Sequence, residues 1–213
     1  MNEIAVSRGE TNNGWVSERV GAIVLAGGRN TRMGGADKAF LTVAGQTVFQ
    51  RTLRLLQGCF PQVVVVSNRP EKYASFDVEV TIDEFPGRGP LAGIHAGLGL
   101  LTRPYAFVVA CDMPFLRLEP ISFLVERIAG QEALIPCWDG DIEPLHAVYA
   151  TGLRPQIADA LHRGVSAIRE FLPCVRAEYV AESVMRRVTG AEESFRNVNT
   201  PEEAARFAVQ VHG

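Results

Sequence analysis

A glycine-rich segment with three cations occupies residues 25–38, with the sequence LAGGRNTRMGGADK. It continues an apolar run at residues 20–26, which predicts a strand buried on both faces. The two Gly-Gly pairs allow backbone N–H groups to approach phosphate oxygens closely. Arg29, Arg32 and Lys38 supply the positive charge that a polyphosphate needs. These residue types, placed directly after a strand, predict a phosphate-binding loop.

The loop departs from the two common phosphate-binding patterns. GxxxxGK[ST] fails because Ala39 follows Lys38, and GxGxxG fails because the glycines are adjacent. A surface turn with incidental charges is the alternative, and a single Gly-Gly pair would favour it. Two pairs flanking Arg29 and Arg32 after a buried strand favour phosphate binding instead.

Asp112 comes directly after the apolar run YAFVVA at residues 105–110. A carboxylate there suits Mg²⁺, which takes few carboxylates and completes its shell with water and phosphate oxygens. The alternative is an aspartate that caps the turn before Pro114. The phosphate-binding loop elsewhere in the chain favours the metal role.

Asn68 and Asp83 follow predicted strands at residues 62–67 and 79–82. A buried amide or carboxylate oxygen there would accept the N1–H and amine protons of guanine and reject adenine. The alternative is a pair of turn residues, and the neighbouring Glu84 leaves an ambiguity of one position at Asp83.

Predicted strands and helices alternate along the chain. Further strands are expected at residues 133–136, 145–150 and 175–180, with helices at 46–56, 91–101, 119–128, 153–161 and 165–172. Thr200 is a candidate N-cap of a last helix, and His95 is interpreted as a helix-packing side chain. The alternation predicts an α/β fold of three α/β/α layers around a mostly parallel central sheet. Ligands of such sheets bind beyond the carboxyl ends of the strands.

Composition limits the class of function. The 213 residues carry 21 Lys and Arg against 24 Asp and Glu, and this net charge of −3 argues against nucleic-acid binding. The start of the chain lacks signal-peptide features, and no apolar stretch is long enough for a membrane span, so we expect a cytoplasmic protein. Residues 1–18 are expected to be a flexible tail, and residues 19–213 a single domain.

The segment LAGGRNTRMGGADKAFL closely resembles the signature LAGGxSxRMGxDKxLL of the molybdenum cofactor guanylyltransferase family. Asn30-Thr31 is a mild departure, at a place where the family often has Ser and a variable residue. The resemblance extends from residue 20 to residue 207 and includes the motifs Ser67-Asn68-Arg69, Gly89-Pro90-Leu91-Ala92-Gly93, Cys111-Asp112-Met113-Pro114, Glu143-Pro144-Leu145 and Asn197-Val198-Asn199-Thr200-Pro201-Glu202-Glu203.

The resemblance implies a Rossmann-like nucleotidyltransferase that moves GMP from GTP to molybdenum-molybdopterin, with transient contacts to cofactor-delivery or acceptor proteins. It assigns Mg²⁺ to Asp112 and catalytic roles to Arg32, Lys38 and Asp112. The nucleotide site that it implies comprises Leu25, Ala26, Gly27, Gly28, Arg32, Lys38, Asn68, Asp83 and Asp112. Asn197, Asn199 and residues 143–146 match motifs near the second substrate.

Three other functions are considered. A cytidylyltransferase for the same pterin is the nearest, but such relatives usually read LAAG where this chain has LAGG. Sugar-phosphate nucleotidyltransferases share the loop and are generally longer. A non-catalytic nucleotide-binding module has no need of Arg32, Lys38 and Asp112 together.

Overall fold

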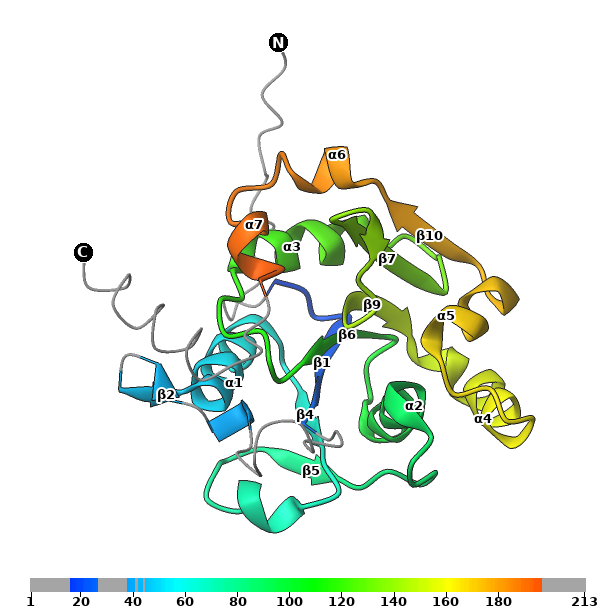
Figure 1. Cartoon of the computed structure of the whole chain (residues 1–213), viewed down its shortest axis with the longest axis horizontal. Coiled ribbons are helices and arrows are strands. Elements are labelled where there is room, and N and C mark those ends of the chain that lie inside the picture. The colour runs from blue at the N-terminus through cyan, green and yellow to red at the C-terminus, as the bar shows by residue number, and fades with distance from the viewer. Residues whose placement is uncertain (1–15, 27–37, 41, 44, 197–213) are drawn as a thin grey trace.

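The computed structural model describes residues 16–26, 38–40, 42–43 and 45–196. An eight-stranded sheet at its centre has the order β10-β7-β9-β6-β1-β4-β5, with β8 paired to β7 (Figure 1). Its strands are β1 (Val20–Leu25), β4 (Val63–Val66), β5 (Glu79–Thr81), β6 (Tyr105–Ala110), β7 (Ala133–Trp138), β8 (Asp141–Ile142), β9 (His146–Ala150) and β10 (Ala177–Val180). A short hairpin joins β2 (Thr42–Val43) to β3 (Gln46–Thr47).

The helices connect these strands and cover the sheet. They are α1 (Val48–Cys59), α2 (Gly89–Leu100), α3 (Leu118–Arg127), α4 (Arg154–His162), α5 (Ile168–Phe171), α6 (Glu182–Met185) and α7 (Ala191–Ser194). The described residues also form four 3-10 helices, which are η1 (Lys38–Phe40), η2 (Pro70–Tyr73), η3 (Thr151–Leu153) and η4 (Leu172–Cys174). None of the described helices has the length and apolar character needed to cross a bilayer.

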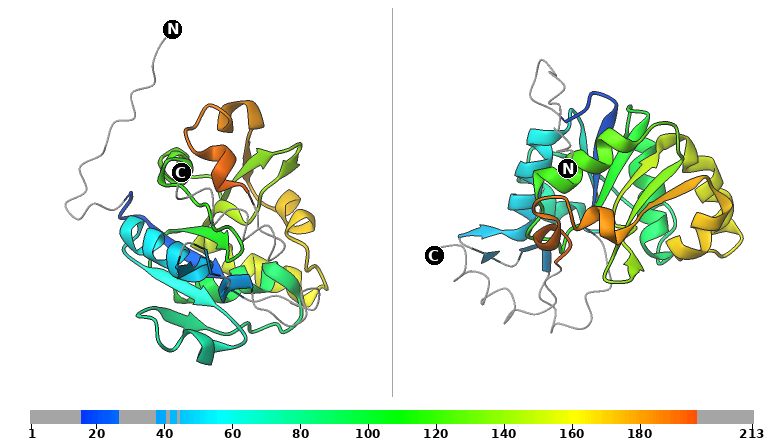
Figure 2. Two further views of the ribbon diagram at one scale, coloured as in Figure 1. Left: turned by 60° about the vertical axis from the view of Figure 1, so that its left-hand side comes forward. Right: turned by 90° about the horizontal axis from the view of Figure 1, so that it is seen from above.

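The sheet separates two cores, and β1 contributes to both. Its residues Ala22 and Val24 pack into the core that includes residues of α1 and α3, whereas Ile23 and Leu25 pack into the core that includes residues of α2, α4 and α5. Figures 1 and 2 show these two groups of helices on opposite faces of the sheet. Alternate side chains of a strand point to opposite faces, so an entirely apolar strand belongs between two helical layers. The predicted three-layer fold is confirmed.

Strand direction decides where the functional edge lies. Strand β1 runs parallel to β4 and β6, and β4 runs parallel to β5. In contrast, β9 is antiparallel to both β6 and β7. Residues 139–145 between β7 and β9 are too few for the helical crossover that a parallel connection needs, so the chain reverses. The sheet is mostly parallel as predicted, with β9 as an exception that the apolar pattern did not mark.

Local sequence explains two of the helices. The side chain of Thr47 accepts a hydrogen bond from the backbone of Gln50, whose side chain accepts one from the Thr47 backbone, and this capping box begins α1. Helix α2 is buried along most of its length and lies close to β1 at Gly97. A Cβ atom at Gly97 would be 2.6 Å from Cγ2 of Ile23, so only glycine fits there.

Some elements differ from their predicted bounds. The pattern at residues 165–172 gave only the short α5 and η4, while β8, α6 and α7 were not predicted. Val16, within the segment predicted as a tail, donates its N–H to the carbonyl of Cys59 at 2.8 Å and so is attached to the end of α1. The predicted cap at Thr200 lies outside the described residues.

A fully buried histidine connects the later strands to the end of the described chain. His146 lies edge-on to Phe107, with ring centroids 5.1 Å apart, and 4.5 Å from the ring of Phe195. Phe195 in turn stacks on Trp138 at 4.9 Å. Neither ring nitrogen of His146 has a hydrogen-bond partner among the described residues, and burial lowers the pKa of His146 to about 3. The aromatic contacts therefore hold a neutral imidazole.

We expect His146 to make the protein less stable in acid. The unfolded histidine takes up a proton near its ordinary pKa of 6.5 and the folded one only near 3. Within this window the unfolded state binds more protons, so the free energy of unfolding falls with falling pH by about 1.4 kcal/mol per pH unit. Urea unfolding at pH 7.5 and pH 5 measures the loss. His146→Leu should reduce the difference in the free energy of unfolding between the two pH values by about 2 kcal/mol. The exposed control His162→Gln should leave this difference unchanged. An equal pH response of His146→Leu and the wild type would contradict this interpretation.

Candidate active site

The parallel strands place their carboxyl ends at one edge of the sheet. Hydrogen bonds continue between the strands just beyond these ends: Ala26 donates to Val66 at 2.9 Å, and Cys111 donates to Leu25 at 3.1 Å. Ser67 likewise donates to Thr81 at 2.9 Å. The residues that follow β1, β4, β5 and β6 therefore begin side by side, as predicted for a ligand site of a parallel sheet.

The start of the glycine-rich loop is fixed by its neighbours. Leu25 and Ala26 are buried, and the carbonyl of Ala26 accepts hydrogen bonds from the Ser67 hydroxyl at 3.4 Å and the Tyr73 hydroxyl at 3.3 Å. The N–H of Ala26 is also paired, so both backbone polar groups of this residue are held by neighbouring strands and loops.

Most of the predicted phosphate-binding residues lie outside the described part of the chain. They are Gly27, Gly28, Arg29 and Arg32. The backbone of Lys38 is described and opens η1.

Asn68 and Asp83 meet at the ends of β4 and β5. The Oδ1 atom of Asn68 accepts a hydrogen bond from the backbone N–H of Asp83 at 3.2 Å. Oδ1 of Asp83 accepts one from the N–H of Phe85 at 2.8 Å. Asn68 is exposed, which differs from the buried oxygen that the sequence suggested. Its side-chain oxygen accepts a hydrogen bond from the turn that contains Asp83. No sequence pattern indicated this contact.

Asp83 and His95 respond to the same partly desolvated environment. Burial raises the pKa of Asp83, and the Phe85 N–H and the charge of His95 oppose this rise. Burial also lowers the pKa of His95, and Arg154 lowers it further. His95 is buried within α2 as a packing residue, with Nδ1 3.8 Å from Oε2 of Glu84, too far for a hydrogen bond.

Asp112 is half-buried in the turn that follows β6. Helix α3 begins only at Leu118 with Arg117 as its N-cap, so Asp112 does not cap that helix. Its place at the carboxyl edge is the one predicted for a metal-binding carboxylate.

A second carboxylate, Glu143, approaches this edge from β9. Val109 of β6 pairs with His146, and the N–H of Ala110 donates to the carbonyl of Leu145 at 3.2 Å. The N–H of Glu143 donates to the carbonyl of Pro136 at 2.8 Å, and the carbonyl of Glu143 accepts the N–H of His146 at 3.2 Å, so Glu143 lies in the turn that leads into β9. Burial is the main cause that raises the pKa of Glu143, with Asp141 next and Asp112 also contributing. The direction of β9 is the signal that would have found this pair.

The structure separates the other candidates near the second substrate. His146 follows Glu143-Pro144-Leu145 but turns into the core, where it is fully buried. Asn197 and Asn199 lie outside the described residues. No group of three or more His, Cys, Asp or Glu side chains within the described ranges forms a metal cage. Two carboxylates at an open edge suit Mg²⁺ better than a closed cage would, because this ion retains water and phosphate oxygens.

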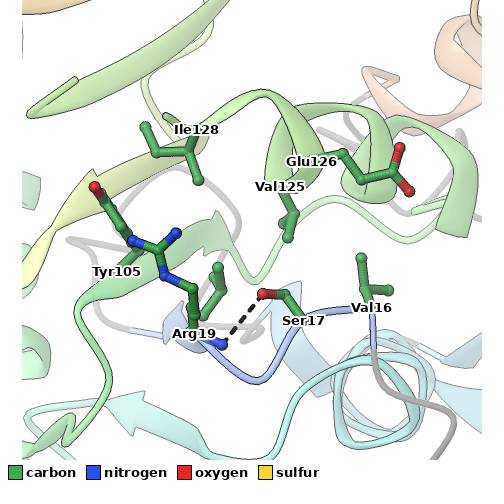
Figure 3. A pocket seen from close by; sticks show the side chains of 8 residues that line it. Val16, Ser17, Arg19, Tyr105, Val125, Glu126 and Ile128 are labelled. Atoms are coloured by element: carbon green, nitrogen blue, oxygen red, sulfur yellow. Dashed lines mark hydrogen bonds between the residues drawn. The ribbon is translucent and has the colours of Figure 1, made fainter. Parts of the chain in front are cut away.

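A pocket of about 220 Å³ lies at the opposite edge of the sheet, near the amino ends of β1 and β6 (Figure 3). The Arg19 guanidinium lies over the Tyr105 ring at 5.4 Å, and the hydroxyl of Ser17 accepts a hydrogen bond from the Arg19 N–H. None of the predicted site residues that the structure describes lines this pocket.

Polar residues after the carboxyl ends of parallel strands place this chain in the class of α/β proteins that bind ligands at that edge of an open sheet. A family model described as MobA-like NTP transferase domain matches residues 22–200. The chain belongs to this family of nucleotidyltransferases, and the resemblance seen in the sequence is confirmed.

Individual relatives match most of the chain. A probable molybdenum cofactor guanylyltransferase of Pelotomaculum thermopropionicum is 34% identical over 88% of this chain and 91% of its own length. A molybdenum cofactor guanylyltransferase of Desulfosudis oleivorans is 35% identical over 87% and 93%. The solved structure of molybdopterin-guanine dinucleotide biosynthesis protein A from Archaeoglobus fulgidus has a TM-score of 0.77 and 30% identity, covering 90% of this chain and 98% of that one.

The contact between Asn68 and Asp83 leads to a titration test. Asn68→Asp keeps an oxygen for the Asp83 N–H but adds a like charge, so it should raise the pKa of Asp83 further. Asn68→Ala removes the acceptor without adding charge and serves as the control. NMR titration of the carboxyl carbons measures both variants. An unshifted pKa in Asn68→Asp would show that the two side chains do not share this turn.

Proposed function

We propose that the protein transfers GMP from GTP to the terminal phosphate of molybdenum-molybdopterin and releases pyrophosphate, in the synthesis of the molybdopterin guanine dinucleotide cofactor. The observation that carries the proposal is the match, over nearly the whole chain, to relatives named molybdenum cofactor guanylyltransferase. The placement of Asn68, Asp83 and Asp112 at one edge supports it. A location in the cytoplasm, a single domain over residues 19–213 and transient contacts with delivery or acceptor proteins remain predictions.

The proposed reaction is a phosphoryl displacement without a covalent enzyme intermediate. An oxygen of the acceptor's terminal phosphate attacks the α-phosphorus of GTP and forms the new P–O–P bond. The bond from the α-phosphorus to the bridging oxygen breaks, and pyrophosphate leaves with its electron pair. Because the attacking oxygen is already anionic, no general base is needed. The protein would contribute positioning and electrostatic stabilisation.

Each site residue has a role in this proposal. Backbone N–H groups of Gly27 and Gly28, with Arg32 and Lys38, would hold the triphosphate. Asp112 would hold Mg²⁺, which supplies positive charge at the α-phosphate and the departing pyrophosphate. Its half-buried carboxylate, which contributes to the raised pKa of Glu143, fits such an ion. The backbone of Leu25 and Ala26 would border the nucleoside.

Asp83 is the stronger candidate for recognising the guanine base. Guanine presents two neighbouring donors, N1–H and the 2-amine, which one carboxylate accepts well. Oδ1 of Asn68 already accepts the Asp83 N–H, so Asn68 offers its amide N–H₂ group to a ligand. In this arrangement Asp83 selects the base and Asn68 supports it.

The choice of nucleotide is the first test. Incubated with Mg²⁺ and molybdenum-molybdopterin, the protein should release pyrophosphate with GTP and not with CTP, ATP or UTP. Thermal unfolding should show the same preference, because a ligand of the folded state raises Tm. Pyrophosphate from CTP would identify a cytidylyltransferase. Stabilisation by a nucleotide without pyrophosphate, in the presence of active acceptor, would favour the non-catalytic binding module.

Removal of the proposed metal carboxylate is the second test. Asp112→Ala should lower kcat by roughly 100-fold or more, because the α-phosphate and pyrophosphate lose their counter-ion. The Tm should change little, since the side chain is only half-buried. Asp159→Ala, at an exposed position of α4, is the matched control and should keep wild-type turnover. Near-normal kcat in Asp112→Ala would remove Asp112 from the metal site.

A further inference from the structure

The residue after Asp83 is tied to a distant helix. Oε1 of Glu84 lies 2.9 Å from Nη2 of Arg154, the first residue of α4. Glu84 and Arg154 are separated by 70 positions in the sequence, so this ion pair joins the end of β5 to the helical layer that contains α2 and α4. Figure 1 shows these two helices side by side.

Arg154 reaches Glu84 across the surface of α2. A Cβ atom at Gly99 would be 2.9 Å from Nε of Arg154, so the glycine leaves room for the arginine. The Nε atom of Arg154 is buried and has no hydrogen-bond partner within the part of the chain that the structure describes. The guanidinium is thus placed by packing against α2 and paired through its outer nitrogen.

Phe85 is held by the same two helices. Its ring lies edge-on to His95 of α2, with centroids 5.1 Å apart, and edge-on to His162 of α4, also at 5.1 Å. The Phe85 backbone N–H donates to Oδ1 of Asp83. A shift of Glu84 or Phe85 would therefore move the donor that orients the Asp83 carboxylate.

We propose that Glu84 and Arg154 are positioning residues that set the direction of the Asp83 carboxylate and thereby the preference for a purine with a 2-amino group. The inference rests on the proposed role of Asp83 at the base. The ion pair orients Phe85, Phe85 orients Asp83, and Asp83 meets the N1–H and 2-amine of guanine. Neither Glu84 nor Arg154 needs to contact the nucleotide.

This role differs from a contribution to global stability. The side chains of Glu84 and Arg154 are 52% and 41% exposed, and ion pairs at such positions add little to the stability of a fold. Their loss should therefore alter nucleotide selection in a protein that remains folded. Comparison of GTP with ITP isolates the effect, because ITP lacks only the 2-amine.

The experiment uses Arg154→Met, Glu84→Gln and the double variant in the full chain. Titration calorimetry with Mg²⁺ gives Kd for GTP and ITP, and steady-state kinetics give KM and kcat. Each single variant should raise Kd and KM for GTP by about tenfold, as expected when one hydrogen bond to a charged group is lost. The values for ITP should rise less, and kcat should change less than twofold.

Two further variants separate positioning from stability. The double variant should raise Kd for GTP no further than the more affected single variant does, because each substitution removes the same ion pair. Arg154→Lys keeps the charge and should recover part of the GTP preference. Arg176→Met breaks the pair between the exposed Arg176 and the half-buried Glu132, in which Nε and Oε2 are 3.6 Å apart, and should leave Kd, KM and kcat unchanged.

The outcomes distinguish this inference from the proposed function. A wild type that prefers GTP, with an unchanged GTP-to-ITP ratio in both variants, would overturn the positioning role alone. Equal losses of affinity for GTP and ITP, in variants whose Tm has dropped, would also overturn the positioning role, since they indicate a structural role. If the wild type binds GTP no better than ITP, both the assignment of Asp83 to the guanine base and the positioning role of Glu84 and Arg154 would be overturned. The calorimetry needs no turnover, so it stands even if the transfer reaction fails.

Discussion

Parallel pairing of β1 with both of its neighbours brings Leu25 level with Val66 of β4 and with Ala110 of β6. The polypeptide leaves the sheet at all three points in the same direction. Without this common level, the glycine-rich loop, Asn68 and Asp112 would emerge at different heights or opposite edges. The apolar character of β1 makes the arrangement possible, because only a strand buried on both faces can be flanked by parallel neighbours beneath two layers of helices.

One antiparallel strand then alters the chemistry of that edge. Because β9 runs against β6, its amino end meets the carboxyl end of β6, and the turn with Glu143 that precedes β9 comes to the edge where Asp112 lies. A parallel β9 would have brought the residues after Ala150 there instead. The same reversal directs His146 into the aromatic core, where it contacts Phe195 directly after α7. A short connection between β7 and β9 thus supplies both an acidic neighbour for Asp112 and an aromatic anchor for Phe195.

Sequence patterns predicted the buried parts of the site better than its polar contacts. The run YAFVVA gave the bounds of β6 correctly, because a strand between two helical layers is apolar throughout. The residues HAVYA suit a parallel or an antiparallel neighbour equally, so the direction of β9 is indicated by the short connection after β7 and not by its apolar pattern. Asn68 was expected to be buried, yet it is exposed and bonded to the Asp83 backbone, a contact between two loops that no periodicity encodes.

Charge at this edge constrains how an anion can bind. Asp83, Asp112 and Glu143 are acidic, and burial raises the pKa of both Asp83 and Glu143, so their charged forms are already disfavoured there. A triphosphate brought to the same edge would be repelled unless positive charge accompanied it. Three cations in the segment after β1 and a divalent ion at Asp112 would provide that charge. In the proposed function the loop and the metal would be interdependent parts of one site, because a polyphosphate brought close to these carboxylates would need the positive charge of both.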